Sequence, residues 1–216
     1  MVFKRRDKRP PLQILQHWVY PPGGWRRAVS YLTHRVRRLP DPPSRIARGL
    51  AAGIFVSFSP FFGFHFILAG LVAWMIRGNI VAGLLATLIG NPVTFPFVAA
   101  MSLGVGDFLF GMESSVPLPR VLKAFSAAAG QITGNLVSMM TGGTAHWDRL
   151  SLFFEGVFLP YLVGGTISGL AAAAATFYLT RPVIEAYQRR RANAVSAGAK
   201  RRRVKADAAS HTGAAK

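Results

Sequence analysis

The chain has 216 residues, a net charge of +18 and 51% hydrophobic residues. It has no cysteine, which excludes a disulfide framework, a thiol nucleophile and a cysteine metal site. High hydrophobicity combined with high charge indicates that the two kinds of residue are segregated along the chain, which is unusual for one soluble domain.

The charges gather at the two ends of the chain. Residues 1–48 hold 12 Lys and Arg against 2 Asp and Glu, and residues 182–216 hold 9 against 2. In between, residues 49–106 have Arg77 and His65 as their only ionisable side chains. An uncharged stretch of that length is typical of a chain that spans or enters a bilayer. We therefore predict an integral membrane protein with basic ends at the anionic cytoplasmic face.

Residues 1–44 form the predicted N-terminal region. A helix is predicted over 25–39, because apolar side chains recur there at spacings of three or four while most arginines lie elsewhere. Pro40 ends this helix. A basic amphipathic helix containing Trp25 is typical of one lying in the membrane interface. The alternative is that it packs on the cytoplasmic face of the protein itself.

The first apolar segment, residues 49–76, is interrupted at Ser59-Pro60. Proline removes a helical N–H and pushes the preceding residue away from helical geometry. We therefore predict two half-helices, with a short non-helical turn over residues 61–65 between them that includes Gly63 and His65. An ionisable side chain at membrane depth is costly, so His65 either contacts a proton or a lipid headgroup, or bonds as a neutral side chain to a backbone carbonyl freed by Pro60.

The second apolar segment, residues 80–106, follows the polar connection Arg77-Gly78-Asn79. It is interrupted by Asn91-Pro92-Val93-Thr94-Phe95-Pro96, where two prolines four residues apart oppose a continuous helix. Asn91 and Thr94 either bind a substrate or cap the second half-helix. The free N–H groups of such a helix start attract phosphate or carboxylate.

Small residues four apart predict faces on which helices pack closely. Gly49 and Gly53 form such a pair in the first apolar segment, and Gly165 and Gly169 form one in the third. That third segment, residues 156–180, is long and apolar enough for a transmembrane helix.

Two weaker elements complete the chain. Residues 116–141 are predicted to form an amphipathic, interfacial helix that does not span the membrane. Residues 181–216 are a basic tail, expected to be helical near the membrane and largely disordered beyond it. The membrane domain itself is assigned to residues 45–180.

The positions of the basic residues and the number of apolar segments predict different topologies unless one broken segment turns back. The positive-inside rule places both ends in the cytoplasm, whereas three full spans would separate them. A half-helix of about ten residues rises about 15 Å, which is half the hydrocarbon thickness. We therefore predict an all-α membrane fold with one broken segment as a re-entrant hairpin, a second broken segment, an interfacial helix and a further transmembrane helix. The sequence does not decide which segment is re-entrant.

Three strings, in this order and spacing, resemble the bacterial family called domain of unknown function 2062. They are Ser59-Pro60-Phe61-Phe62-Gly63-Phe64-His65, Arg77-Gly78-Asn79 and Asn91-Pro92-Val93-Thr94-Phe95-Pro96. The resemblance covers roughly residues 40–178. It implies a small module of the bacterial plasma (inner) membrane, found alone and sometimes joined to glycosyltransferase-like regions, and it implies no activity.

Two functions follow as hypotheses. The first is a transport or lipid-handling module that binds an anionic headgroup or small anion where the breaks and Arg77 form a polar pocket. The second is a structural or assembly protein that docks envelope-biosynthesis partners such as glycosyltransferases. The candidate binding residues are Ser59, Pro60, Gly63, His65, Arg77, Asn79, Asn91, Pro92, Thr94 and Pro96.

An enzyme is not expected, because no acid pair, metal-ligand cluster, activated nucleophile or phosphate-binding loop is recognisable. We accordingly predict no catalytic residue, no metal and no cofactor. The expected partners are anionic lipids at the cytoplasmic face, and a membrane-protein partner or a second copy of the chain. Nucleic acid is not expected, because no recognition module accompanies the basic ends.

Overall fold

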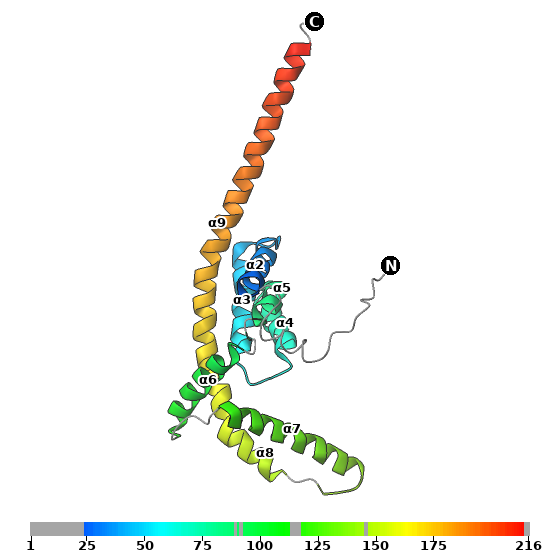
Figure 1. Cartoon of the computed structure of the whole chain (residues 1–216), viewed down its shortest axis with the longest axis vertical. Coiled ribbons are helices and arrows are strands. Elements are labelled where there is room, and N and C mark those ends of the chain that lie inside the picture. The colour runs from blue at the N-terminus through cyan, green and yellow to red at the C-terminus, as the bar shows by residue number, and fades with distance from the viewer. Residues whose placement is uncertain (1–23, 89, 91–92, 113–117, 145–146, 214–216) are drawn as a thin grey trace.

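The computed structural model describes residues 24–88, 90, 93–112, 118–144 and 147–213, and all regular structure among them is helical (Figure 1). The predicted all-helical class is confirmed for these residues. In chain order the helices are α2 (Gly24–Arg37), α3 (Pro43–Ser57), α4 (His65–Met75), α5 (Ile80–Thr87), α6 (Phe95–Phe110), α7 (Leu118–Met140), α8 (Asp148–Phe153), the π-helical turn η1 (Phe154–Phe158) and α9 (Leu159–Gly213).

The first apolar segment folds back on itself. α3 ends shortly before Pro60, the chain turns, and α4 begins at His65. After α4, the backbone N–H of Asn79 donates to the carbonyl oxygen of Arg45, with 2.9 Å between nitrogen and oxygen. The segment therefore ends beside the start of α3. The break at Pro60 reverses the chain and makes a helical hairpin, which is more than a bend in one continuous span.

α5 then runs alongside α3 in the same direction. Gly49 of α3 lies against the backbone of Asn79, and Gly53, one turn later, lies against the backbone of Gly83. A Cβ atom on Gly53 would also lie 2.7 Å from the Cβ of Ala86, closer than real side chains approach. The glycines let the two helix backbones touch, which is how helices pack tightly where apolar burial gives little driving force.

α9 is the long axis of the molecule (Figure 1). Its Gly164 lies against the backbone of α6 at Ser102, and its Gly165 lies against the carbonyl of Phe58 at the end of α3. A Cβ on Gly169 would lie 3.1 Å from the carbonyl oxygen of Phe55. α9 therefore passes first α6 and then α3 in the antiparallel sense.

One stretch of described helix is long and apolar enough to cross a membrane, and it covers Leu150–Gly198. The predicted transmembrane segment, residues 156–180, lies within it. The π-helical turn η1 interrupts the hydrogen-bond pattern shortly before Pro160, where the ring cannot donate.

The helix does not stop at Arg181. α9 continues through the basic tail to Gly213, whereas the sequence predicts a largely disordered region over most of residues 181–216. The tail is rich in Ala, Arg and Lys, which are strong helix formers. Pro182 lies inside the helix without ending it. Only the backbone is described beyond Gly198.

α7 and α8 form an arm that projects from the body of the protein (Figure 1). The rings of Phe125 on α7 and Phe153 on α8 pack edge to face, 4.9 Å between centroids. The helix predicted over residues 116–141 is therefore present as α7. Towards its C-terminal end α7 exposes apolar side chains, since Leu136 and Met140 are 57% and 82% exposed.

Candidate functional site

The two helix breaks meet around Phe62. Its ring packs edge to face on Phe95 of the second break, 5.2 Å between centroids, and on Phe125 of α7, 4.8 Å between centroids. It also stacks on Tyr161 of α9 at 6.0 Å. Edge-to-face rings at these separations stabilise beyond the area they bury. The space between the breaks is therefore filled by aromatic rings, where the sequence suggests a polar pocket.

His65 lies beside the first break with a backbone partner. Its Nε2 is 3.2 Å from the carbonyl oxygen of Ser59, and its ring contacts Phe62. This geometry matches the structural alternative, in which a histidine satisfies a carbonyl freed by proline. The Ser59 hydroxyl oxygen is buried and has no hydrogen-bond partner among the described residues. Gly63 has a φ of +88°, which the turn requires and which glycine adopts without strain.

The second break is described only in part, because Asn91 and Pro92 lie outside the described residues. Thr94 occupies the N-cap position of α6, where its carbonyl accepts from the N–H groups of Phe97 and Val98. Pro96 lies in the first turn of α6, where a missing N–H costs nothing. Thr94 and Pro96 therefore start a helix.

Arg77 and Asn79 belong to a different cluster at the other end of α3. The Asn79 side chain accepts from the N–H of Ala82 at 2.7 Å, which caps α5, and donates to the carboxylate of Asp41. The Arg48 guanidinium donates to the carbonyl oxygen of Arg77 at 2.9 Å. Most of the polar groups of the Arg77-Gly78-Asn79 string are therefore used within the protein.

The ten candidate residues thus fall into two groups. Asn79 lies against Gly49, whereas the first break follows Phe58, nine residues further along α3. Nine helical residues correspond to about 14 Å. Arg77 and Asn79 therefore do not share a pocket with His65 or Thr94, contrary to the pocket suggested by the sequence.

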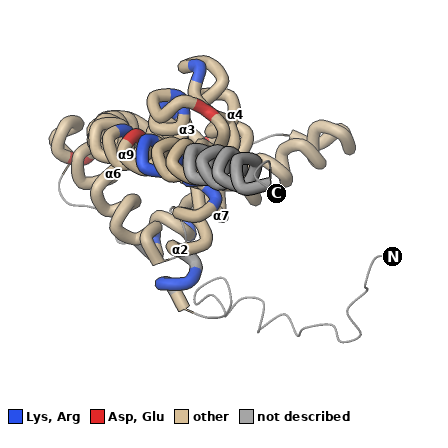
Figure 2. The backbone as a smooth tube through the Cα atoms, turned by 90° about the horizontal axis from the view of Figure 1, so that it is seen from above, with Lys and Arg blue, Asp and Glu red and all other residues tan. Residues whose placement is uncertain are grey.

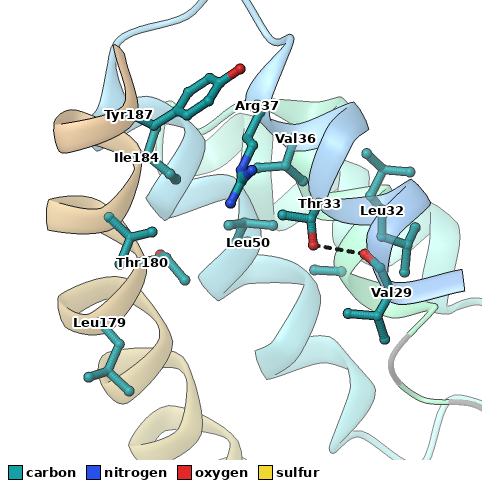
Figure 3. Close-up of a pocket in the computed structure, with 13 residues that line it drawn as sticks. Val29, Leu32, Thr33, Val36, Arg37, Leu50, Leu179, Thr180, Ile184 and Tyr187 are labelled. Atoms are coloured by element: carbon teal, nitrogen blue, oxygen red, sulfur yellow. Dashed lines mark hydrogen bonds between the residues drawn. The ribbon is translucent and has the colours of Figure 1, made fainter. Parts of the chain in front are cut away.

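A crevice that the sequence does not reveal lies between α2 and α9 (Figure 3). It has a volume of about 350 Å³, within the range of about 300–1,000 Å³ typical of ligand pockets. Its floor is formed by residues of α3 and α5. The lining residues are Val29, Leu32, Thr33, Val36, Arg37, Leu50, Leu85, Ala86, Leu179, Thr180, Val183, Ile184 and Tyr187.

The walls of the crevice present almost no free hydrogen-bonding groups. Nine of the thirteen lining residues are aliphatic. The two threonine hydroxyls are already bonded along their own helices, Thr33 to the carbonyl of Val29 at 2.7 Å and Thr180 to that of Thr176 at 2.6 Å. The walls therefore offer hydrocarbon rather than hydrogen-bonding groups to an occupant.

The polar groups of the crevice gather at one end. The Arg37 guanidinium carbon lies 5.0 Å from the centroid of the Tyr187 ring, a cation–π contact between α2 and α9. Figure 3 shows Arg37 and Tyr187 at one end of the crevice, with Val29 and Leu179 at the other. The crevice is therefore amphipathic along its length.

The family described as an uncharacterized protein conserved in bacteria (DUF2062) matches residues 26–193. The chain belongs to this family. The match confirms the family suggested by the three strings and extends further than the roughly 40–178 that the strings imply. No curated protein and no solved structure matches the chain significantly.

The extent of the family match bears on the crevice. Its lining residues run from Val29 to Tyr187, so all of them lie within the matched residues 26–193. The crevice is therefore built from the part of the chain that defines the family, whereas the far end of α9 lies beyond it.

Proposed function

We propose that the protein is an integral membrane protein of the bacterial plasma membrane that holds a lipid in the crevice between α2 and α9. Membrane integration is supported by the long apolar stretch of α9 and by bulky apolar side chains left exposed on the shorter helices. Trp74 of α4 is 67% exposed, and Phe97 and Phe108 of α6 are 75% and 84% exposed. Apolar patches of this kind typically face lipid or a partner.

The proposed topology has an even number of crossings. The hairpin of α3 and α4 enters and leaves at one level, α5 and α6 together cross, and α9 returns. In support, Gln188 of α9 donates to the carbonyl oxygen of Asp41 at 3.0 Å, so the chain just after α2 lies beside the basic part of α9 that follows Arg181. Basic ends on one side agree with the positive-inside rule, with both termini in the cytoplasm.

The apolar crevice is the observation that carries the lipid-handling proposal. Solute transport through the breaks requires water there, whereas the ring of Phe62 and its aromatic neighbours fill that space. The crevice instead offers an elongated hydrocarbon surface with a polar end, which matches the chemistry of a lipid. In this proposal the chain is a binding module without enzymatic activity.

A test is to extract membranes at alkaline pH, purify the protein in a mild detergent and weigh the intact complex by native mass spectrometry. We expect the protein to stay in the membrane and to retain lipid. Val183→Trp should displace that lipid, because Val183 lines the crevice and is 62% exposed, so the larger ring has room to enter. Val195→Trp is the matched control on the same helix, outside the crevice.

Two results would contradict the proposal. Release of the protein by alkaline extraction would show that it is not an integral membrane protein. Equal lipid retention by the wild type and by Val183→Trp would show that the lipid does not bind in the crevice.

A structural or assembly role is the second candidate, and the dry packing of the breaks favours it. Kinks filled by aromatic rings shape a rigid body on which partners such as envelope glycosyltransferases could dock. Cross-linking in cells distinguishes the two. A scaffold would give a defined protein adduct through the α7–α8 arm, and Val183→Trp would leave that adduct unchanged.

A further inference from the structure

We propose that the lipid in the crevice is an anionic phospholipid, with its phosphate on Arg37 and one acyl chain along the apolar walls. This inference rests on the proposed lipid-handling function and specifies the class of lipid. It is carried by the charge of Arg37, by the pairing of the neighbouring carboxylates with other arginines and by the position of the crevice along α9.

Arg37 has no carboxylate partner among the described residues. Two carboxylates lie near it, Asp41 one turn beyond Arg37 and Glu185 two residues before Tyr187, and they are already paired with Arg45 and Arg189. The Arg37 guanidinium instead lies over the ring of Tyr187 in a cation–π contact, which positions its charge at this end of the crevice. A guanidinium pairs with a phosphate through two parallel hydrogen bonds, and such charge-assisted bonds are among the strongest in proteins.

The surroundings of Arg37 favour an anion. α2 contains no Asp or Glu, and it carries Arg35 close to Arg37, whereas Arg26 and Arg27 lie at its opposite end, before Val29. Figure 2 shows Lys and Arg on α2, and both basic and acidic residues along α9. The Arg35 side chain donates to the hydroxyl of Tyr31. The positive charge at the Arg37 end of the apolar crevice favours anionic over zwitterionic headgroups.

The crevice lies at the depth where a phospholipid changes from chain to headgroup. Leu179 lies near the end of the apolar stretch of α9, Arg181 is the first charge after it, and Tyr187 follows. From Leu179 to Tyr187 is about 12 Å along the helix. The interfacial zone on each side of the hydrocarbon is about 5–7 Å thick. The Arg37 end therefore reaches the phosphates while the Leu179 end is still among the acyl chains.

The test compares phosphatidylglycerol with phosphatidylcholine on the full-length protein, by native mass spectrometry after equilibration with mixed micelles of each lipid. We expect the wild type to retain phosphatidylglycerol about tenfold more tightly. Arg37→Gln should lose that preference, and a tenfold loss corresponds to about 1.4 kcal/mol. Arg38→Gln, which removes an exposed charge one residue away and outside the crevice lining, should retain it.

The outcomes separate this inference from the function on which it rests. If both lipids bind equally and Val183→Trp still displaces them, the crevice holds lipid but the anionic class is wrong. If Arg38→Gln and Arg37→Gln weaken binding equally, general surface charge explains the preference and the Arg37 site is wrong. If inorganic phosphate displaces phosphatidylglycerol, the headgroup alone is bound and the acyl-chain part is wrong. If no lipid is retained by the wild type, the proposed function itself fails.

Discussion

Gly106 and Gly164 face each other where α6 crosses α9, so that a Cβ atom on Gly164 would lie 2.9 Å from the Cα of Gly106. A Cβ on Gly106 would likewise collide with the backbone of Pro160. No flexible side chain is present to move aside. This crossing joins the second broken segment to the long helix, so the close approach of two glycines fixes how the two halves of the molecule meet.

Gly106→Ala should therefore destabilise the protein. Overpacking a tight contact costs typically about 1–3 kcal/mol, and we expect a lower melting temperature in detergent, measured by circular dichroism. Gly104→Ala is the control two residues away on the same helix, because a Cβ there meets nothing within 4 Å. Replacing an open helical glycine should leave stability equal or raise it by up to about 1 kcal/mol. Equal melting temperatures for the two variants would mean that the helices do not cross at Gly106.

Asn79 and Asp41 should behave as a coupled pair. Asn79→Ala removes both the cap of α5 and the bond to Asp41, and loss of a cap alone costs typically about 1 kcal/mol. Asn79→Asp keeps the capping oxygen but sets two carboxylates against each other, so it should also destabilise. The double variant Asp41→Asn, Asn79→Asp restores one amide and one carboxylate, and its melting temperature should recover. If the melting temperature of the double variant falls by the sum of the two single-variant decreases, the two side chains are not in contact.

Much of the helical layout follows from local sequence. Pro60 interrupts its segment because the ring removes an N–H, and α4 begins at His65, the last residue of the expected turn. What the sequence leaves open is the direction of the chain after that turn, because a proline permits both a kink and a reversal. The bond from Asn79 to Arg45 decides for a reversal, and it depends on residues 34 apart in the chain.

In the candidate site, too, local contacts could be predicted from the sequence and long-range contacts could not. His65 beside Ser59 is a contact between near neighbours, so the structural alternative could be stated from the sequence. The crevice could not be, because Arg37 and Tyr187 are 150 residues apart and each looks ordinary on its own helix. The apolar spacing of α2 predicts a buried face without naming what covers it. Pairing that face with α9 requires the tertiary fold.

Water should not reach the first break. The chain has no native cysteine, so Ser59→Cys gives a single thiol with little change in volume. Because the Ser59 hydroxyl is buried, we expect no labelling by a membrane-impermeant maleimide, applied to whole cells or to inverted vesicles. Ala194→Cys, on the exposed part of α9, should label from one side and serves as the control. Labelling at residue 59 from either side would establish a water-filled break and favour a transport pocket over the aromatic packing.

Tyr161 buries a hydroxyl that has no hydrogen-bond partner among the described residues, and its side chain is fully buried in the aromatic cluster around Phe62. An unsatisfied buried polar group costs about 1–3 kcal/mol. Tyr161→Phe keeps the ring contacts and removes only that oxygen, so it should raise the melting temperature or leave it unchanged. Tyr161→Ala is the control for the ring itself, because loss of a buried aromatic side chain costs about 3–5 kcal/mol. If Tyr161→Phe instead lowers the melting temperature as strongly as Tyr161→Ala does, the hydroxyl must bind a group inside the membrane domain, and the breaks around it would be a polar site after all.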